Sequence, residues 1–485
     1  MEEPFFVCVY KKDGMPIGKI VSPENEFPES FEEIKVKSSD GDNIEEKASE
    51  FEKIFESYCN SILSYIDMLP FIASISPMVG DAIRSVGLIN FLKEKSGKTI
   101  ETEGRDIFEV PSRFYSDFKE IADSANKASA VGRQIPKMMI IGIVSTYEHH
   151  LARLIRKILS SNPDRLTSSD KQVSIKDVFD AKGIDEFKEI VLDKEIDMIM
   201  RNSFEEQVSW VEKAIGIRKE IKSEHGDWPK IVELFERRNL FTHTNGIVND
   251  RYLKKSVKLK VSGSSALVKG QELFAGSKYL TSALEIICEF GIKIIQVSWR
   301  KLSKGHAKIA DDRLGDFGFE LIERGNYGLT IKIFEFFFYL EGSKTEERRL
   351  TCLVNLANAY KLNGDSKKAE KLLDQEDFSV VNDTFKICVA SVGGDCDEVV
   401  KIMKRMGIDC DIGEKAYEDW PVFFHVREKE QFKDAFKDVF GREYIPSPKK
   451  RRGISNAMRK NEFRAQEKKS DEPLLLSPSA VERED

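Results

Sequence analysis

The sequence predicts a mainly α-helical protein that begins with a small β-rich module. Apolar residues recur at three- and four-residue intervals through most of the chain, which is the period of one helix face. Near the start, two β-branched and aromatic runs are instead separated by Asp13-Gly14, a pair typical of hairpin turns. Because 485 residues exceed a single core, we expect about three domains or more.

The β-rich module covers residues 1–43. Its predicted strands run from Phe5 to Tyr10 and from Ile17 to Val21, and a third is expected at residues 31–37. From about residue 44 the pattern is helical throughout. We expect residues 44–114 to form a helical segment that packs on the bundle that follows.

The bundle is predicted at residues 115–305. A helix from Ser116 to Ser160 is apolar nearly all round in its middle, as a central buried helix would be. Residues 173–215 supply one or two amphipathic helices, and residues 271–302 contain a last long apolar one. Between them Asp227-Trp228-Pro229 predicts a helix start, with aspartate as the N-cap and proline in the first turn.

Residues 311–442 have a different sequence pattern. The run from Leu353 to Leu373 resembles a tetratricopeptide repeat (TPR), and a weaker copy precedes it from Phe317 to Phe334. We expect a short α-solenoid that binds a protein or peptide, with generic helical hairpins as the alternative. Residues 446–485 form a charged tail that is expected to be disordered.

Composition limits the class of function. Hydrophobic residues make up 41% and charged residues 33%, and the formal net charge is -7, so any RNA contact must come from a local patch. Seven cysteines without CxxC spacing, and no signal peptide, favour a cytoplasmic protein. The best membrane candidate, residues 63–80, is interrupted by Asp67 and two prolines, so no membrane association is expected.

Only one segment concentrates reactive side chains. Arg238 is followed by the polar Asn239 and, five residues on, by His243, and then by a string that includes Gly246, Val248, Asn249 and Tyr252. This segment resembles the Arg-x4-His motif of the HEPN superfamily of ribonucleases. The resemblance implies an all-α bundle, with Glu148 as a supporting acidic residue, and a homodimer in which two motifs line one cleft.

The chemistry of these residues fits RNA cleavage without a metal or cofactor. Histidine can act as acid or base near neutral pH, and arginine carries fixed positive charge to phosphate oxygens. Attack by the ribose 2′-OH would leave a 2′,3′-cyclic phosphate. His149-His150 lack further ligands at metal-binding spacing, so no metal site is expected.

Helix geometry indicates that one chain on a regular helix does not hold a complete active site. Asn239 and His243 are four residues apart and share a face, so the amide can orient the imidazole. Arg238 and His243 are about 140° apart around a helix. They converge on one phosphate only if the helix bends or ends, or if a second copy supplies the partner. The resemblance to the HEPN superfamily implies the second, and we therefore expect a symmetric dimer with a composite site.

The sequence thus predicts a HEPN-type endoribonuclease, of the kind found in toxins and antiphage (abortive infection) effectors, regulated through its C-terminal repeats. The alternative is a non-catalytic dimeric HEPN/TPR scaffold. In that case Arg238 would cap a helix or pair with Glu236 or Glu148, and His243 would be an ordinary histidine at a helix end.

Overall fold

The fold is described from a computed structural model. The described residues are 6–12, 15–21, 49–81, 88–95, 98–102, 105–162, 181–217, 221, 226–261, 266–340, 344–408 and 412–445. The predicted third strand at residues 31–37 and the charged tail from residue 446 lie outside them, as does Asp13-Gly14. The chain divides into two compact units, Met1–Ser49 and Glu50–Asp485.

In the first unit the described residues form one antiparallel strand pair. Strand β1 (Phe6–Lys12) pairs with β2 (Met15–Val21), and Val9 lies opposite Gly18. The two strands span nearly the same residues as the two runs that suggested a hairpin in the sequence.

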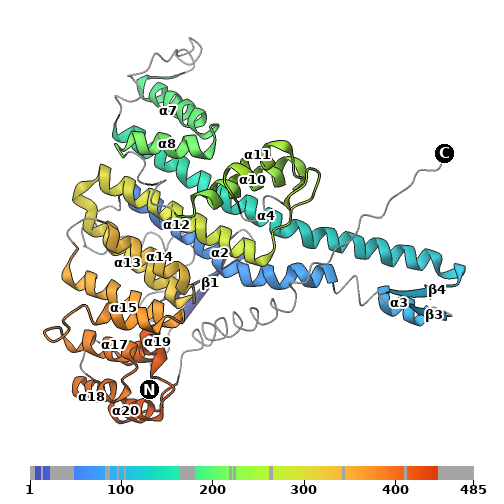
Figure 1. The fold of residues 1–485 in the computed structure, drawn as a ribbon. Helices are drawn as coiled ribbons and strands as arrows, with labels where there is room; N and C mark the ends of the chain where they lie inside the picture. Colours follow the sequence, from blue (N-terminus) through green and yellow to red (C-terminus); the bar gives the residue numbers. More distant parts are fainter. Residues whose placement is uncertain are drawn as a thin grey trace. The chain divides into compact units, whose positions relative to one another are not determined.

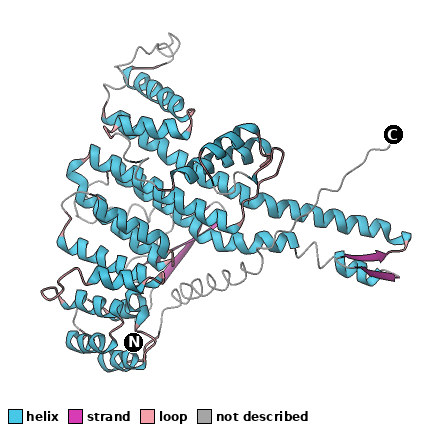
Figure 2. Cartoon of the chain, viewed as in Figure 1, coloured by secondary structure: helices cyan, strands magenta, loops and turns pink. Residues whose placement is uncertain are grey.

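The second unit is mainly helical (Figures 1 and 2). Its amino-terminal part contains α2 (Glu50–Asp81), α3 (Leu88–Lys95), α4 (Tyr115–Ser161), α7 (Ile184–Met200), α8 (Phe204–Ala214), α10 (Trp228–Thr244), α11 (Asp250–Lys258) and α12 (Ser277–Leu302), with a 3₁₀ turn, η2 (Ser112–Phe114), before α4. The observed α4 agrees within one residue at each end with the helix predicted at 116–160. Residues 63–80 lie within the single helix α2.

Helices α2, α4 and α12 pack together at the centre of this part. Their contact residues are almost completely buried, including Tyr58 on α2, Tyr147 on α4 and Trp299 on α12. The Tyr58 hydroxyl donates to the Ile287 carbonyl oxygen at 2.6 Å. A Cβ at Gly291 would lie 2.2 Å from that hydroxyl, so a glycine is required for this close approach. Helix α10 packs on α4 and α12.

The expectation of helix throughout residues 44–114 was wrong for part of the segment. Strands β3 (Lys98–Thr102) and β4 (Arg105–Glu109) form an antiparallel pair in which Ile100 lies opposite Ile107. The physical reason is local: the β-branched and aromatic residues Thr99, Ile100, Thr102, Ile107 and Phe108 favour an extended chain.

The C-terminal part is a succession of helices: α13 (Ala307–Glu323), α14 (Tyr327–Tyr339), α15 (Glu346–Leu362), α16 (Ser366–Leu373), α17 (Asp383–Gly393), α18 (Cys396–Met406), α19 (Glu414–Asp419) and α20 (Glu430–Phe440), with 3₁₀ turns η4 (Lys304–His306) and η5 (Pro421–His425). Helix α13 pairs with α14, α15 with α16, and α17 with α18, while the first members also contact one another in order. A glycine with positive φ stands in the turn of each pair: Gly325, Gly364 and Gly394.

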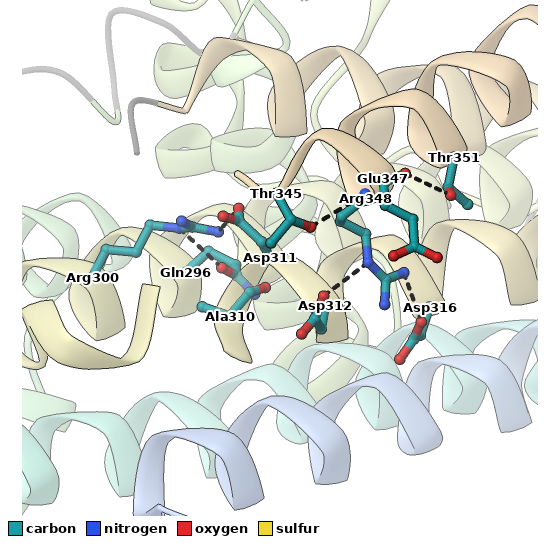
Figure 3. A network of polar contacts seen from close by, with 10 residues as sticks. All are labelled: Gln296, Arg300, Ala310, Asp311, Asp312, Asp316, Thr345, Glu347, Arg348 and Thr351. Carbon is teal, nitrogen blue, oxygen red and sulfur yellow. Dashed lines mark hydrogen bonds and ion pairs between the residues drawn. The ribbon is translucent and has the colours of Figure 1, made fainter. Parts of the chain in front are cut away.

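A polar network joins the last bundle helix to the first C-terminal helices (Figure 3). Arg300 on α12 donates to Asp311 on α13 at 2.8 Å, and Arg348 on α15 donates to Asp312 at 2.8 Å and to Asp316 at 3.0 Å. Buried apolar residues also form one cluster from Phe51 to Ala359, and a second cluster runs from Leu353 to Tyr444. The bundle and the first C-terminal helices therefore share a core.

Candidate functional site

Helix α10 carries the three residues of the candidate motif. It starts where the sequence predicted: Asp227 occupies the N-cap position and Pro229 the first turn. The Asp227 carboxylate does not cap the backbone but accepts hydrogen bonds from Lys230 at 2.6 Å and Lys332 at 3.2 Å. Burial would raise the pKa of this carboxyl group, but the two lysines hold it below its usual value.

One face of α10 is anchored by a buried polar network around Glu233, which is only 3% exposed. Its carboxylate accepts hydrogen bonds from Arg237 Nε at 2.6 Å, from the Tyr252 hydroxyl and from the Tyr279 hydroxyl at 2.9 Å. The Arg237 guanidinium also lies over the Tyr279 ring, 4.0 Å from its centroid. Burial raises the pKa values of both tyrosines, with Glu233 adding to the effect, so both stay protonated donors at neutral pH. Arg237 is therefore a structural residue.

The opposite face of the C-terminal half of α10 is open. Arg238, Asn239, Thr242 and His243 are half-buried or exposed, whereas Leu240 and Phe241 are buried. At about 100° per residue, Arg238 and His243 stand at the two edges of this open face and Asn239 and Thr242 lie between them. We call these four residues the open face of α10.

Arg238 forms an ion pair across to α4. Its Nη2 donates to the Glu148 Oε1, and the two side chains are 20% and 25% exposed. This is one of the two pairings considered from the sequence, and it brings Arg238 and Glu148 together. The Arg238 Nε is buried and has no hydrogen-bond partner in the described part of the chain.

His243 lies apart from this pair. Its side chain is exposed, and no hydrogen bond or ion pair joins it to another described residue. Helix α10 continues without a break from Arg238 to Thr244, so it neither bends nor ends between Arg238 and His243. The two side chains therefore stay about 140° apart around the helix, and one chain does not aim both at the same phosphate.

The residues that follow the motif have structural roles. Asn245 ends α10 in the left-handed conformation (φ 50°, ψ 30°), and Gly246 has a φ of 90° and donates to the Leu240 carbonyl oxygen at 3.0 Å. A Cβ at Gly246 would lie 3.0 Å from the Leu273 carbonyl oxygen. Val248 is buried, and Asn249 caps α11 through the Tyr252 amide. This string shapes the turn after α10.

Sequence reasoning missed Lys137, which fastens that turn to α4. It is 2% exposed and donates to the Asn245 carbonyl oxygen at 2.8 Å and to Glu272 at 2.6 Å. A cation is favourable there because the carbonyl end of α10 carries partial negative charge. A lone lysine in the apolar run that follows Pro136 was the available signal.

The remaining candidates do not form a metal or nucleotide site. His150 is buried, with its Nε2 3.1 Å from Ser57 Oγ and its Nδ1 2.8 Å from the Thr146 carbonyl oxygen, while His149 is exposed. Burial lowers the pKa of His150. Among the described residues, no three or more His, Cys, Asp or Glu side chains gather as metal ligands would. The sequence Ser96-Gly97-Lys98-Thr99 matches the end of a P-loop motif, but Lys98 and Thr99 begin a strand, whereas a P-loop leads into a helix.

Searches of protein-family models, of curated proteins and of solved structures return no match to this chain. Within the described ranges, no helix combines the length and apolar character needed to cross a membrane.

Proposed function

We propose that the open face of α10 is the catalytic surface of a metal-independent HEPN-type endoribonuclease that acts as a homodimer. The observation that carries the proposal is the division of α10 into two faces. Buried Glu233 pairs with Arg237 on one side, whereas half-buried Arg238 and Asn239 and exposed His243 line the other. A helix held this firmly positions exposed side chains well, as catalysis requires.

The roles follow from the chemistry of the groups. Arg238 holds the scissile phosphate and stabilises charge in the transition state. His243 transfers the proton to or from the reacting oxygen. Asn239, one helical turn before His243, orients the imidazole, and Glu148 positions Arg238 through their ion pair. Because Arg238 and His243 lie at opposite edges of the open face, the second copy completes each site.

The proposal also assigns a role to each part of the chain. Residues 115–305 act as the HEPN-like bundle and residues 311–442 as TPR-like repeats that bind a protein or peptide trigger, with residues 1–43 as a separate β module. Together these parts fit a cytoplasmic toxin or antiphage effector. The shared core and the ion pair of Arg300 on α12 with Asp311 on α13 connect these repeats directly to the bundle. This biological role rests on analogy with the family that the motif resembles.

The test is cleavage of a defined RNA in EDTA. Wild type should give a product ending in a 2′,3′-cyclic phosphate, and a substrate with a 2′-deoxy nucleotide at the scissile position should not be cut. His243→Ala should lower the rate by about 10²- to 10⁴-fold, and Arg238→Ala by about 10²-fold or more. His149→Ala, also an exposed histidine, and Arg156→Ala, also an ion-paired arginine, are the matched controls. Loss of cleavage in EDTA would contradict the mechanism.

A second candidate is the non-catalytic dimeric scaffold. The pairing of Arg238 with Glu148 favours it, because the pair also has a purely structural interpretation. That candidate predicts equal, background rates for wild type, His243→Ala and Arg238→Ala, and harmless overexpression in cells.

A further inference from the structure

Helix α11, which follows the turn after α10, concentrates positive charge in an acidic protein. Residues 250–260 contain one acidic residue, Asp250, and five basic ones: Arg251, Lys254, Lys255, Lys258 and Lys260. The chain as a whole has a formal net charge of -7. The concentration is therefore local, as a nucleic-acid contact in this chain would have to be.

The basic side chains of α11 share one exposed face. Arg251, Lys254 and Lys258 are exposed and fall within an arc of about 60° around the helix. The opposite face is buried through Tyr252 and Ser256, with Leu253 packed against the core. We call Arg251, Lys254 and Lys258 the cationic stripe of α11.

The cationic stripe lies beside the open face of α10. Arg251 Nε is 3.5 Å from Glu236 Oε2, and Glu236 stands seven residues before His243, about two turns along the same edge of α10. Arg251 is nevertheless 75% exposed. Of the other acidic neighbours, Glu205 pairs with Lys255 of α11, while Asp250 pairs with Lys269 and also interacts with Lys254.

Lys254 and Lys258 make no ion pair with any described residue. Asp250 lies close enough to Lys254 to interact with its charge, but the three cations of the stripe outnumber this one carboxylate. An anion with several charges would therefore bind the stripe favourably. A membrane surface is the weaker partner, because an interfacial helix inserts an apolar face and the apolar face of α11 is buried in the protein. A phosphodiester backbone needs only the charges.

We propose that the cationic stripe of α11 contacts the phosphate backbone of the RNA strand that reaches the open face of α10. Arg251 and Lys258 are about 10 Å apart along the helix axis, enough to contact two or three successive phosphates. The contact reads no bases, so it fixes where a strand lies relative to His243 and not which sequence is cut. The identity of the ligand rests on the proposed function.

The test is binding of a short, fluorescently labelled 2′-O-methyl RNA, which has no 2′-OH and cannot be cleaved by the proposed reaction. We compare wild type with Lys254→Ala/Lys258→Ala. Removing two phosphate contacts should reduce the slope of log affinity against log salt by about 1.4, so a fourfold rise in salt should weaken wild type about sevenfold more than the variant. Lys367→Ala/Lys371→Ala on α16 is the control, with two exposed lysines at the same spacing.

The inference is overturned if Lys254→Ala/Lys258→Ala keeps the wild-type salt slope, or if Lys367→Ala/Lys371→Ala reduces that slope as much. It is also overturned if wild type does not bind the RNA. The same holds if Lys254→Ala/Lys258→Ala weakens binding to phosphatidylserine vesicles but not to RNA. Cleavage is scored separately. If Lys254→Ala/Lys258→Ala weakens RNA binding but the wild-type protein cuts no RNA, this inference stands and the proposed reaction is excluded. Normal thermal unfolding of both variants excludes misfolding.

Discussion

The two faces of helix α10 are built from similar residues and have opposite environments. Arg237 and Arg238 are neighbours in the sequence, yet Arg237 is clamped by Glu233 and stacked on Tyr279, while Arg238 reaches outward to the rim residue Glu148. The first arrangement holds the helix in the bundle. The second arrangement places Arg238 on the open face, about one and a half helical turns before His243. Position on the helix, more than residue type, therefore distinguishes the structural residues of α10 from the candidate catalytic ones.

The largest effect should come from the buried face. Glu233→Ala removes the one carboxylate that pairs with Arg237 and accepts from Tyr252 and Tyr279. An uncompensated buried cation should then lower the free energy of unfolding by about 3–5 kcal/mol. Denaturant unfolding followed by circular dichroism measures this. Glu186→Ala, at an exposed glutamate on α7, is the control and should change stability by less than about 0.5 kcal/mol.

A smaller effect is expected at the rim of the open face. Glu148→Ala frees Arg238 to adopt several orientations, so the cleavage rate should fall by about tenfold. Stability should change by less than about 1 kcal/mol, because the ion pair is partly solvated. Glu50→Ala, which removes another ion pair to α4, is the control. A faster Glu148→Ala enzyme would mean that Glu148 restrains Arg238 instead of positioning it.

The smallest effect is expected in the pH dependence of stability, from the buried His150. Burial lowers the pKa of His150 below its usual 6.5, so between that value and the lowered one the unfolded chain binds more protons than the folded chain. The stability contributed by neutral His150 is therefore present above pH 6.5 and is lost as the pH falls through this window. The unfolding temperature of wild type should fall more steeply on acidification than that of His150→Gln, and an equal dependence would contradict the assignment.

Sequence patterns anticipated the elements and not their contacts. The ends of α4 and the start of α10 followed from apolar periodicity and from Asp227-Trp228-Pro229, because these signals are local. The network of Glu233 with Tyr252 and Tyr279 joins residues 19 and 46 positions apart, and no local pattern marks such partners. The pair of β3 and β4 was missed because each strand is only five residues long and neither alternates apolar and polar residues.

The candidate site divides in the same way. The helical phase of Arg238, Asn239 and His243 was predictable, since it needs only 3.6 residues per turn. That α10 runs unbroken past His243 was not, because its end depends on Lys137 from α4 and on the turn at Gly246. The pair of Arg238 with Glu148 was one of two pairings considered from the sequence, and it forms where α10 packs on α4.

The central claim is that Arg238 of one copy works with His243 of the other, and subunit mixing tests it most directly. Arg238→Ala and His243→Ala are each inactive alone in this account. Unfolded, mixed in equal amounts and refolded together, they should form about half heterodimers with one intact site in two, and so recover about a quarter of the wild-type cleavage rate in EDTA. A mixture as inactive as its parents, with heterodimers present by native mass spectrometry, would contradict the composite site.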